Sequence, residues 1–506
     1  MTIRIDPSAA KGTVSPLLHG QFIEFLGECI DEGLWVGPDS PIPNTDGIRS
    51  AALEALKRLA PPLLRWPGGC YADTYHWQDG IGPRDQRPTT YNENFGTFEL
   101  DHHGFGTDEY LRLCEALGAQ PWMNVNMLSG SVREMRDWME YCNRAEPTDL
   151  ARLRSANGHS EPYGVRYWGL GNEPWCGGGN MTPSTYMDLY RLYASAMPSF
   201  THSNDEPSMM YPIACGPDGN KPVERVEWTR QLFQELASFR QPPISAYDLH
   251  FYNWNIEHPE DTSTEFDQAG WTRVVEGCLE LEDIIGEQWG LMQAGLAAMP
   301  HPEAAKDPRL ESVDLVIGEW GNWHLDAFEV RPALRQQVTM RDAVTTALTL
   351  DILQRSCDKI SMACNAQTIN VLNSLILTEG DATILTPNYD VFMMYQGHRG
   401  ARALGLDRQD AQTGVYTFAS VKDGHVLVDL TNASMDQSVD QTLTLPVDAR
   451  VEDFRCLTSD DPHRFNDKAD PDAVRSRQVA LDAPTGREFT VHLEPASVNT
   501  LTLSLV

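Results

Sequence analysis

The feature that most constrains the fold is a regular alternation of short apolar runs with longer amphipathic stretches between residues 17 and 398. The apolar runs are nearly continuous, which is typical of parallel strands that are covered by helices. Eight runs are predicted as strands, at residues 17–26, 62–69, 120–127, 166–174, 208–217, 246–254, 314–323 and 358–372. Eight successive strand–helix units predict an α/β fold, a (β/α)₈ barrel.

The stretches between the strands carry helix signals. Thr182 is a natural N-cap and Pro183 suits the first helical turn. The apolar side chains that follow fall on one helix face, at Tyr186, Leu189, Tyr190, Tyr193 and Met197. A second helix is predicted from Thr107 to a stop at Gly118, and 389–400 is expected to form the last barrel helix. Residues 84–106 and 458–476 are polar and are expected to be loops.

The last hundred residues follow a different period. Val426, Val428 and Leu430 alternate with polar neighbours, which indicates antiparallel strands with one wetted face. Ile3 and Ile5 alternate in the same way, so the N-terminal strand is expected to join this region. The predicted organisation is an N-terminal strand at 1–16 that joins the β-sandwich, a catalytic barrel at 17–400, and a C-terminal antiparallel β-sandwich at 401–506.

The charge balance narrows the range of partners. The chain has 39 Lys plus Arg against 72 Asp plus Glu, a formal net charge of −33. Such a field repels nucleic acid and anionic membranes, so neither is expected as a partner, and a neutral or cationic ligand remains. The N-terminus lacks a basic flank and an apolar core, and no run reaches the roughly 18 apolar residues of a membrane span. These observations predict a cytoplasmic protein.

The cysteines and histidines give no sign of a metal site. Ten cysteines are scattered along the chain without a C-x-x-C pair, as expected for free thiols in a reducing compartment. His102 with His103, and His250 with His258, lack the acidic or thiolate partners that a metal site requires. No metal is therefore expected.

Two glutamates follow apolar strands directly. Glu173 ends the fourth predicted strand after Asn172, and Glu319 ends the seventh before Trp320. Active residues of such barrels gather at the carboxyl ends of the strands. A single strand-end glutamate is more often a helix cap or an ion-pair partner, for instance of Arg65. Two together, each near a tryptophan, favour the acid/base and nucleophile pair of glycoside hydrolysis.

Several motifs together resemble one family. They are His19-Gly-Gln-Phe-Ile-Glu24-Phe-Leu-Gly, Leu64-Arg65-Trp-Pro-Gly-Gly69, Trp77-Gln-Asp-Gly-Ile-Gly-Pro83, Phe105-Gly-Thr-Asp-Glu-Tyr110, Gly171-Asn-Glu173, His250-Phe-Tyr252, Gly318-Glu319-Trp320 and Ala366-Gln367. The chain is similar to the glycoside hydrolase family 51 α-L-arabinofuranosidases over nearly its whole length. The resemblance implies a (β/α)₈ barrel followed by a C-terminal β-sandwich.

The resemblance also implies roles for individual residues. Glu173 would be the acid/base and Glu319 the nucleophile, and no cofactor is implied. Asn172 would bind the sugar's 2-hydroxyl, Glu24 and Arg65 the other hydroxyls, while Tyr252 would touch the nucleophile and Gln367 would close the subsite. The expected substrate-binding residues are Glu24, Arg65, Cys70, Asn172, Trp175, His250, Tyr252 and Gln367. Cys70 stands where many relatives carry Asn, so one polar substrate contact is expected to be either weaker or remade.

The expected activity is exo-acting, retaining hydrolysis of terminal α-L-arabinofuranosyl residues from neutral oligosaccharides derived from arabinan or arabinoxylan. Retention predicts carboxyl groups roughly 5–5.5 Å apart, against about 6.5–9.5 Å for inversion. Two alternatives remain open: a relative with another substrate, such as an endo-glucanase or another furanosidase, and a non-catalytic carbohydrate-binding protein. The resemblance implies a homo-oligomer, often a hexamer.

Overall fold

The computed structural model describes residues 2–202, 208–238, 241–299, 313–328, 332–406, 414–481 and 484–506. The chain divides into two compact units. One comprises Met1–His19, Tyr252–Ile285 and Trp320–Val506, and the other comprises Gly20–Phe251 and Gly286–Glu319. All ten cysteines are free thiols. Among the described helices, none combines the length and apolar character needed to cross a bilayer.

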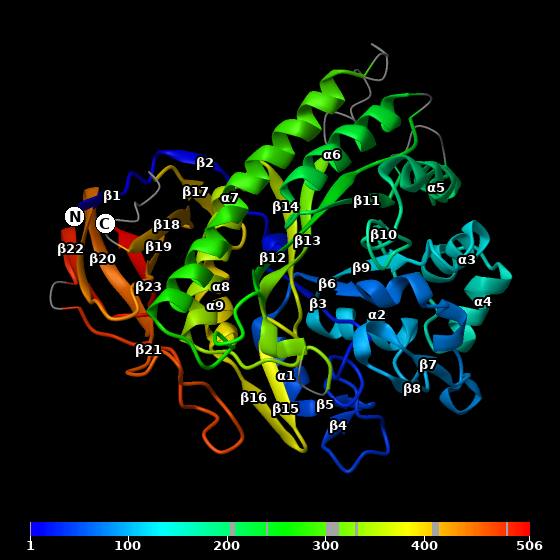
Figure 1. The fold of residues 1–506 in the computed structure, drawn as a ribbon, viewed down its shortest axis with the longest axis horizontal. Helices are drawn as coiled ribbons and strands as arrows, with labels where there is room; N and C mark the ends of the chain where they lie inside the picture. Colours follow the sequence, from blue (N-terminus) through cyan, green and yellow to red (C-terminus); the bar gives the residue numbers. More distant parts are fainter. Residues whose placement is uncertain are drawn as a thin grey trace. The chain divides into compact units, whose positions relative to one another are not determined.

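A closed barrel of eight strands confirms the predicted fold (Figure 1). Its order is β10-β11-β12-β13-β14-β3-β6-β9. The strands are β3 (Gly20–Phe22), β6 (Leu63–Trp66), β9 (Gln120–Val125), β10 (Tyr167–Leu170), β11 (Tyr211–Asp218), β12 (Ala246–Asn255), β13 (Asp314–His324) and β14 (Ile360–Asn365). Each corresponds to one predicted run. The first run was predicted too long, because Pro16–His19 forms a 3₁₀ turn before β3.

The helices begin and end where their capping residues indicate. Thr182 accepts a hydrogen bond from the Thr185 amide at the start of α5 (Pro183–Ala196). Gly118 adopts a left-handed φ of +67° after α2 (Thr107–Leu117). The others are α1 (Ser50–Leu59), α3 (Val132–Asn143), α4 (Asp149–Ala156), α6 (Pro222–Ala237), α7 (Gln268–Ala297), α8 (Met340–Arg355) and α9 (Pro387–Tyr395). Figure 1 shows α2, α3 and α5 outside strands β9 and β10, as a barrel requires.

The polar segment 84–106 is more ordered than its composition indicated. It contains an antiparallel hairpin of β7 (Thr90–Asn92) and β8 (Glu99–Asp101). Strands of three residues are too short to produce a detectable period, so the expectation of a simple loop was wrong here. Two further hairpins pair β4 (Asn44–Thr45) with β5 (Ile48–Arg49) and β15 (Ile376–Glu379) with β16 (Ala382–Leu385).

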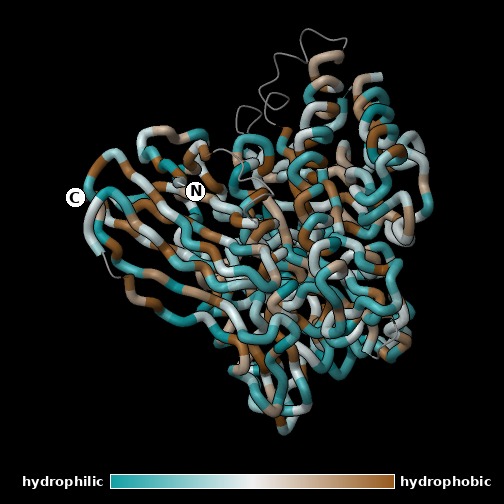
Figure 2. The backbone as a smooth tube through the Cα atoms, turned by 60° about the vertical axis from the view of Figure 1, so that its left-hand side comes forward, coloured by the Kyte–Doolittle hydropathy of each residue, from teal (hydrophilic) through white to brown (hydrophobic). Residues whose placement is uncertain are grey.

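The C-terminal region forms one nine-stranded sheet that takes in two N-terminal strands. Its members are β1 (Thr2–Arg4), β2 (Ala10–Thr13), β17 (Arg402–Leu404), β18 (Val415–Lys422), β19 (His425–Asn432), β20 (Val439–Leu457), β21 (Arg477–Gln478), β22 (Thr485–Leu493) and β23 (Ser497–Leu505). The pairings are antiparallel except that β1 runs parallel to β20. Val426, Val428 and Leu430 lie in its buried core with Ile3 and Ile5. Hydrophobic and hydrophilic residues alternate along these strands in Figure 2, which is the pattern that the sequence predicted.

Candidate active site

The Glu319 carboxylate lies on β13 in a buried ion pair with Arg65 of β6. The Arg65 guanidinium donates from Nη1 to Glu319 Oε1 at 2.7 Å and from Nη2 to Asn172 Oδ1 at 2.6 Å. Its central carbon lies 4.5 Å from the centroid of the Phe22 ring and 5.4 Å from that of Trp122. Two aromatic rings and two acceptors thus fix the guanidinium, and its charge favours the ionised form of Glu319.

Glu173 follows β10 in a backbone conformation that residues other than glycine rarely adopt. Its φ is +42°, in the left-handed region, and its carbonyl oxygen accepts the amides of Cys176 at 2.8 Å and Gly178 at 3.1 Å. Burial and the nearby negative charge of Glu319 raise the pKa of the Glu173 carboxyl, and the hydrogen bond from His250 opposes them. Glu173 is therefore the carboxyl of this pair that tends to keep its proton.

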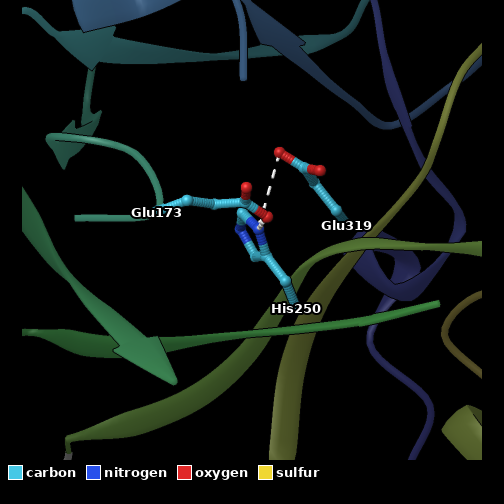
Figure 3. A group of neighbouring side chains, drawn as sticks. All are labelled: Glu173, His250 and Glu319. Atoms are coloured by element: carbon cyan, nitrogen blue, oxygen red, sulfur yellow. Dashed lines mark hydrogen bonds and ion pairs between the residues drawn. The ribbon is translucent and has the colours of Figure 1, made fainter. Parts of the chain in front are cut away.

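The His250 imidazole, on β12, contacts both glutamates (Figure 3). Nδ1 lies 2.8 Å from Glu173 Oε1 and 3.5 Å from Glu319 Oε1, while Nε2 lies 3.1 Å from Asp248 Oδ2. Burial disfavours the charged ring, but the negative charges of Glu319 and Asp248 outweigh it, and the pKa of His250 lies well above its usual value. The site therefore contains an imidazolium among carboxylates.

The separation of the two glutamates bears on their chemistry. Ligand atoms of Glu173, His250 and Glu319 all lie within 4.8 Å of one another, so a pair of carboxyl oxygens is this close. The same three side chains have the geometry to surround a metal ion. A metal needs a neutral imidazole, whereas His250 favours its protonated form, and Arg65 already supplies positive charge to Glu319. The donor set therefore fits proton transfer better than metal binding.

Glu24, just after β3, is buried beside the glycines of the Trp-Pro-Gly-Gly motif. Oε1 accepts the Tyr71 amide at 3.0 Å and Asn94 Nδ2 at 3.1 Å. A Cβ at Gly69 would lie 2.5 Å from Oε1, so any other residue there would displace the Glu24 carboxylate from its hydrogen bonds. Burial and the charge of Glu319 raise the pKa of Glu24 to about 7. Glu24 therefore shares the electrostatic environment of the catalytic pair.

Three other predicted residues lie beside this group. Among the described residues, Asn172 Nδ2 is buried without a hydrogen-bond partner, so it is available to a ligand. Trp175 donates from Nε1 to the Gly216 carbonyl at 3.2 Å, which fixes its half-buried ring. Burial and the charge of Glu173 raise the pKa of the Cys70 thiol well above its usual value, so Cys70 is a neutral thiol.

Tyr252 and Gln367 belong to the other compact unit, and their expected substrate contacts stay predictions. Tyr252 packs edge to face against Trp323, with ring centroids 5.1 Å apart. Gln367 is buried, and its backbone amide donates to the Val371 carbonyl at 3.1 Å.

Two buried aspartates, Asp73 and Asp248, belong to this site but are not predicted from the sequence. Asp248 Oδ1 accepts the amide of Gly318, directly before Glu319, at 2.6 Å. Asp73 Oδ2 accepts the amide of Asn172, directly before Glu173, at 3.2 Å. Asp248 has a weak signal, since it lies two residues before His250 on the same strand and therefore on the same face. Asp73 has none, because it lies in a short 3₁₀ turn without a period.

Known proteins resemble the chain in sequence and in structure. The model of the alpha-L-arabinofuranosidase 1 domain matches residues 55–270, and that of the alpha-L-arabinofuranosidase C-terminal domain matches 318–497. An intracellular exo-alpha-L-arabinofuranosidase of Bacteroides ovatus is 34% identical over 520 residues, which cover 99% of this chain and 95% of that protein. A probable alpha-L-arabinofuranosidase C of Aspergillus flavus is 29% identical, covering 87% and 86%.

Solved structures agree with these matches. The GH51 arabinofuranosidase from Xanthomonas axonopodis pv. citri superposes with a TM-score of 0.88 at 32% identity over 99% of both chains. The alpha-L-arabinofuranosidase from Thermotoga maritima, solved as an arabinose complex, gives a TM-score of 0.83 at 26% identity over the full length of both chains. The chain therefore belongs to glycoside hydrolase family 51, the α-L-arabinofuranosidases, which are enzymes that hydrolytically release arabinofuranosyl residues.

Proposed function

We propose that the chain is an exo-acting, retaining α-L-arabinofuranosidase that removes terminal arabinofuranosyl residues from oligosaccharides derived from arabinan or arabinoxylan. The observation that carries the proposal is the pair formed by the half-buried Glu173 and the buried Glu319, with carboxyl oxygens within 4.8 Å and opposite electrostatic surroundings. This spacing supports retention, because inverting enzymes need about 6.5–9.5 Å to admit a water molecule. The Bacteroides ovatus relative, an intracellular exo-alpha-L-arabinofuranosidase, supports the exo mode.

In the first step, the Glu319 carboxylate attacks the anomeric carbon while the protonated Glu173 donates its proton to the leaving oxygen. Arg65 holds Glu319 charged and oriented at 2.7 Å. The aglycone alcohol departs, and an arabinofuranosyl ester remains on Glu319. Asn172 Nδ2, which is otherwise unpaired among the described residues, donates to the 2-hydroxyl of the sugar.

In the second step, Glu173 acts as a base. It removes a proton from a water molecule, which attacks the anomeric carbon and releases Glu319 as a carboxylate, with net retention. Glu24 and Arg65 bind the remaining furanose hydroxyls, Trp175 and Cys70 line the site, and Gln367 and Tyr252 complete it. The imidazolium of His250 steadies Glu173 whenever that carboxyl is charged.

Product analysis tests the proposal. An aryl α-L-arabinofuranoside and linear arabino-oligosaccharides are incubated with the enzyme, and the first anomer released is followed by proton NMR. We expect α-arabinofuranose first and one sugar per cleavage event. An initial β-anomer would refute retention, and internal cleavage of glucan without arabinose release would favour an endo-glucanase. Cleavage of an aryl galactofuranoside alone would indicate another furanosidase. Oligosaccharide binding without any sugar release would indicate a non-catalytic protein.

We also propose the organisation expected from the sequence: a strand at 1–16 joining the sandwich, a barrel at 17–400 and a sandwich at 401–506. The pairing of β1 with β20 supports the first of these. We further propose a cytoplasmic location, supported by the intracellular relative, and a homo-oligomer with a hexamer as the specific expectation. Cell fractionation and light scattering test these two.

A further inference from the structure

Asp73 is a buried carboxylate whose described partners are backbone amides. It lies in the 3₁₀ turn Cys70–Thr74 and is 1% exposed. Oδ1 accepts the amide of Met127, just after β9, at 3.0 Å, and Oδ2 accepts that of Asn172, just after β10, at 3.2 Å. Among the described residues no basic side chain forms an ion pair with it. Burial without a cation raises the pKa of Asp73 to about 7, while the hydrogen bonds from the backbone amides of Met127 and Asn172 oppose that rise and stabilise the ionised form.

The turn that Asp73 holds is the turn that carries Glu173. Asn172 directly precedes Glu173, whose left-handed φ of +42° is unfavourable for a side chain of this kind. Such a conformation persists only where neighbouring contacts determine it. The amide of Asn172 is fixed by Asp73, and the carbonyl of Glu173 is fixed by the amides of Cys176 and Gly178.

The segment after Glu173 also lies against Asp73. A Cβ at Gly178 would be 2.9 Å from Asp73 Oδ2 and 1.8 Å from the Asn172 carbonyl oxygen, and one at Gly177 would be 3.2 Å from Cys70 Sγ. The glycines therefore let the chain close over the Cys70–Thr74 turn. Asp73 thus contacts the chain on both sides of Glu173.

We propose that Asp73 is a positioning residue for the acid/base: it sets the backbone from which the Glu173 carboxyl reaches the leaving oxygen. The proposal rests on the acid/base role proposed above for Glu173. A displacement of about 1 Å can slow an enzymatic step about 100-fold. A shift of Glu173 weakens protonation of the leaving group and leaves attack by Glu319 intact. Asp73 therefore acts most strongly on substrates with poor leaving groups.

The test compares two leaving groups in the Asp73→Asn variant. The Met127 and Asn172 amides reach different oxygens of Asp73, and in asparagine one of these oxygens is replaced by an NH2 group, which cannot accept a hydrogen bond. We expect kcat/KM for an arabinobiose, which has an alcohol leaving group, to fall about 30-fold or more. For a dinitrophenyl α-L-arabinofuranoside, whose leaving group needs no proton, we expect a loss of about threefold or less.

A matched control separates positioning from general destabilisation. Asp108 is also buried, and its carboxylate accepts the hydroxyls of Tyr141 and Tyr163, both at 2.8 Å, neither of which adjoins a catalytic glutamate in sequence. Asp108→Asn is expected to lower the activities on both substrates by the same factor, if it lowers them at all. Asp73→Glu, which keeps the charge but moves it by one methylene, is expected to repeat the selective loss.

Each outcome decides the proposal. Equal losses on both substrates in a folded Asp73→Asn or Asp73→Glu variant would overturn it, and so would failure of both variants to fold at the assay temperature, because the role would then be purely structural. Wild-type enzyme that cleaves neither arabinofuranoside would instead refute the proposed function. A selective loss on arabinobiose in the Asp73 variants, with Asp108→Asn unselective, supports the positioning role.

Discussion

The regions around Glu173 and Glu319 show how one residue type is prepared for two tasks. Glu319 faces a guanidinium at 2.7 Å that is itself held by Phe22 and Trp122. Glu173 is half-buried near that negative charge, and its described charged partner is the imidazolium of His250, which also contacts Asp248. The backbones are held alike, since the amide before each glutamate donates to a buried aspartate. Their side-chain partners, rather than their supports, therefore set the difference between nucleophile and acid.

The strongest test of this comparison removes the nucleophile. Glu319→Ala should lower kcat at least about 10⁴-fold, because no other carboxylate can form the ester and the alternative is uncatalysed attack by water. Added azide should restore turnover of an activated aryl arabinofuranoside with an inverted glycosyl azide as product. Circular dichroism should show an intact fold. Substantial activity without azide would reverse the assignment of the two glutamates.

Removal of the acid should have a smaller and more selective effect. Glu173→Ala is expected to lower kcat/KM about 10²–10⁴-fold on substrates with alcohol leaving groups and much less on dinitrophenyl substrates. The alkaline limb of the pH–rate profile should disappear with the carboxyl that causes it. Azide should now give a product of retained configuration. An inverted azide would show that Glu173, not Glu319, is the nucleophile.

Substitutions of Arg65 can distinguish the effect of its charge on Glu319 from the effect of its hydrogen-bond geometry. Arg65→Lys keeps the charge, but an ammonium cannot make the parallel contacts to Glu319 and Asn172, so kcat/KM should fall about 10–100-fold. Arg65→Met should lose more, because it leaves a buried carboxylate without its cation. Equal losses in the two variants, measured at several pH values, would show that charge contributes nothing to the preparation of Glu319.

A substitution of His250 tests how its charge affects the pKa of Glu173, through the pH dependence of kcat/KM. Its positive charge lowers the pKa of Glu173, against the burial and the Glu319 charge that raise it. The His250→Asn variant removes the cation, so the pKa of Glu173 should rise and the alkaline limb of kcat/KM should move to higher pH, with about a tenfold loss at the optimum. A limb that moves to lower pH, or stays in place, would contradict the electrostatic role assigned to His250.

The parts of this site that the sequence revealed are those marked by position along a strand. The eight strands and both glutamates follow from apolar runs and from what stands at their ends. Asp73 could not be found in this way, because its partners lie 54 and 99 residues further along the chain and are backbone amides, which have no residue identity. The charge of His250 could not be predicted from the sequence either, since it depends on three carboxyl groups that only folding brings together.

The smallest effect concerns a buried carboxyl outside the catalytic group. Burial and the negative charge of Asp429 raise the pKa of Asp351, on α8, well above its usual value, just as burial and a neighbour raise that of Glu173. The native state therefore keeps a proton that the unfolded chain loses above its ordinary pKa, and stability falls as pH rises through that window. Asp351→Asn should leave kcat within about twofold and reduce the fall in Tm between pH 5 and pH 8.

Asp342, on the same helix, has a lowered pKa, so its effect on the pH dependence of stability is opposite in sign to that of Asp351. Burial alone would raise its pKa, but His324, with Nε2 at 2.9 Å, and Arg341 lower it. Asp342→Asn should therefore cost stability at pH 7, and that cost should shrink as pH falls below the ordinary range of an aspartate. Thermal melts at pH 5 and pH 8 check the sign for Asp351→Asn, and melts at pH 7 and at about pH 3, below the ordinary pKa of an aspartate, check the sign for Asp342→Asn. A sharp fall of kcat in Asp351→Asn would mean that the effect of a raised carboxyl pKa on stability cannot be separated from an effect on catalysis in this fold. Unchanged kcat would show that a raised carboxyl pKa alone does not make a catalytic acid, and that Glu173 needs its position beside Glu319 and His250 as well.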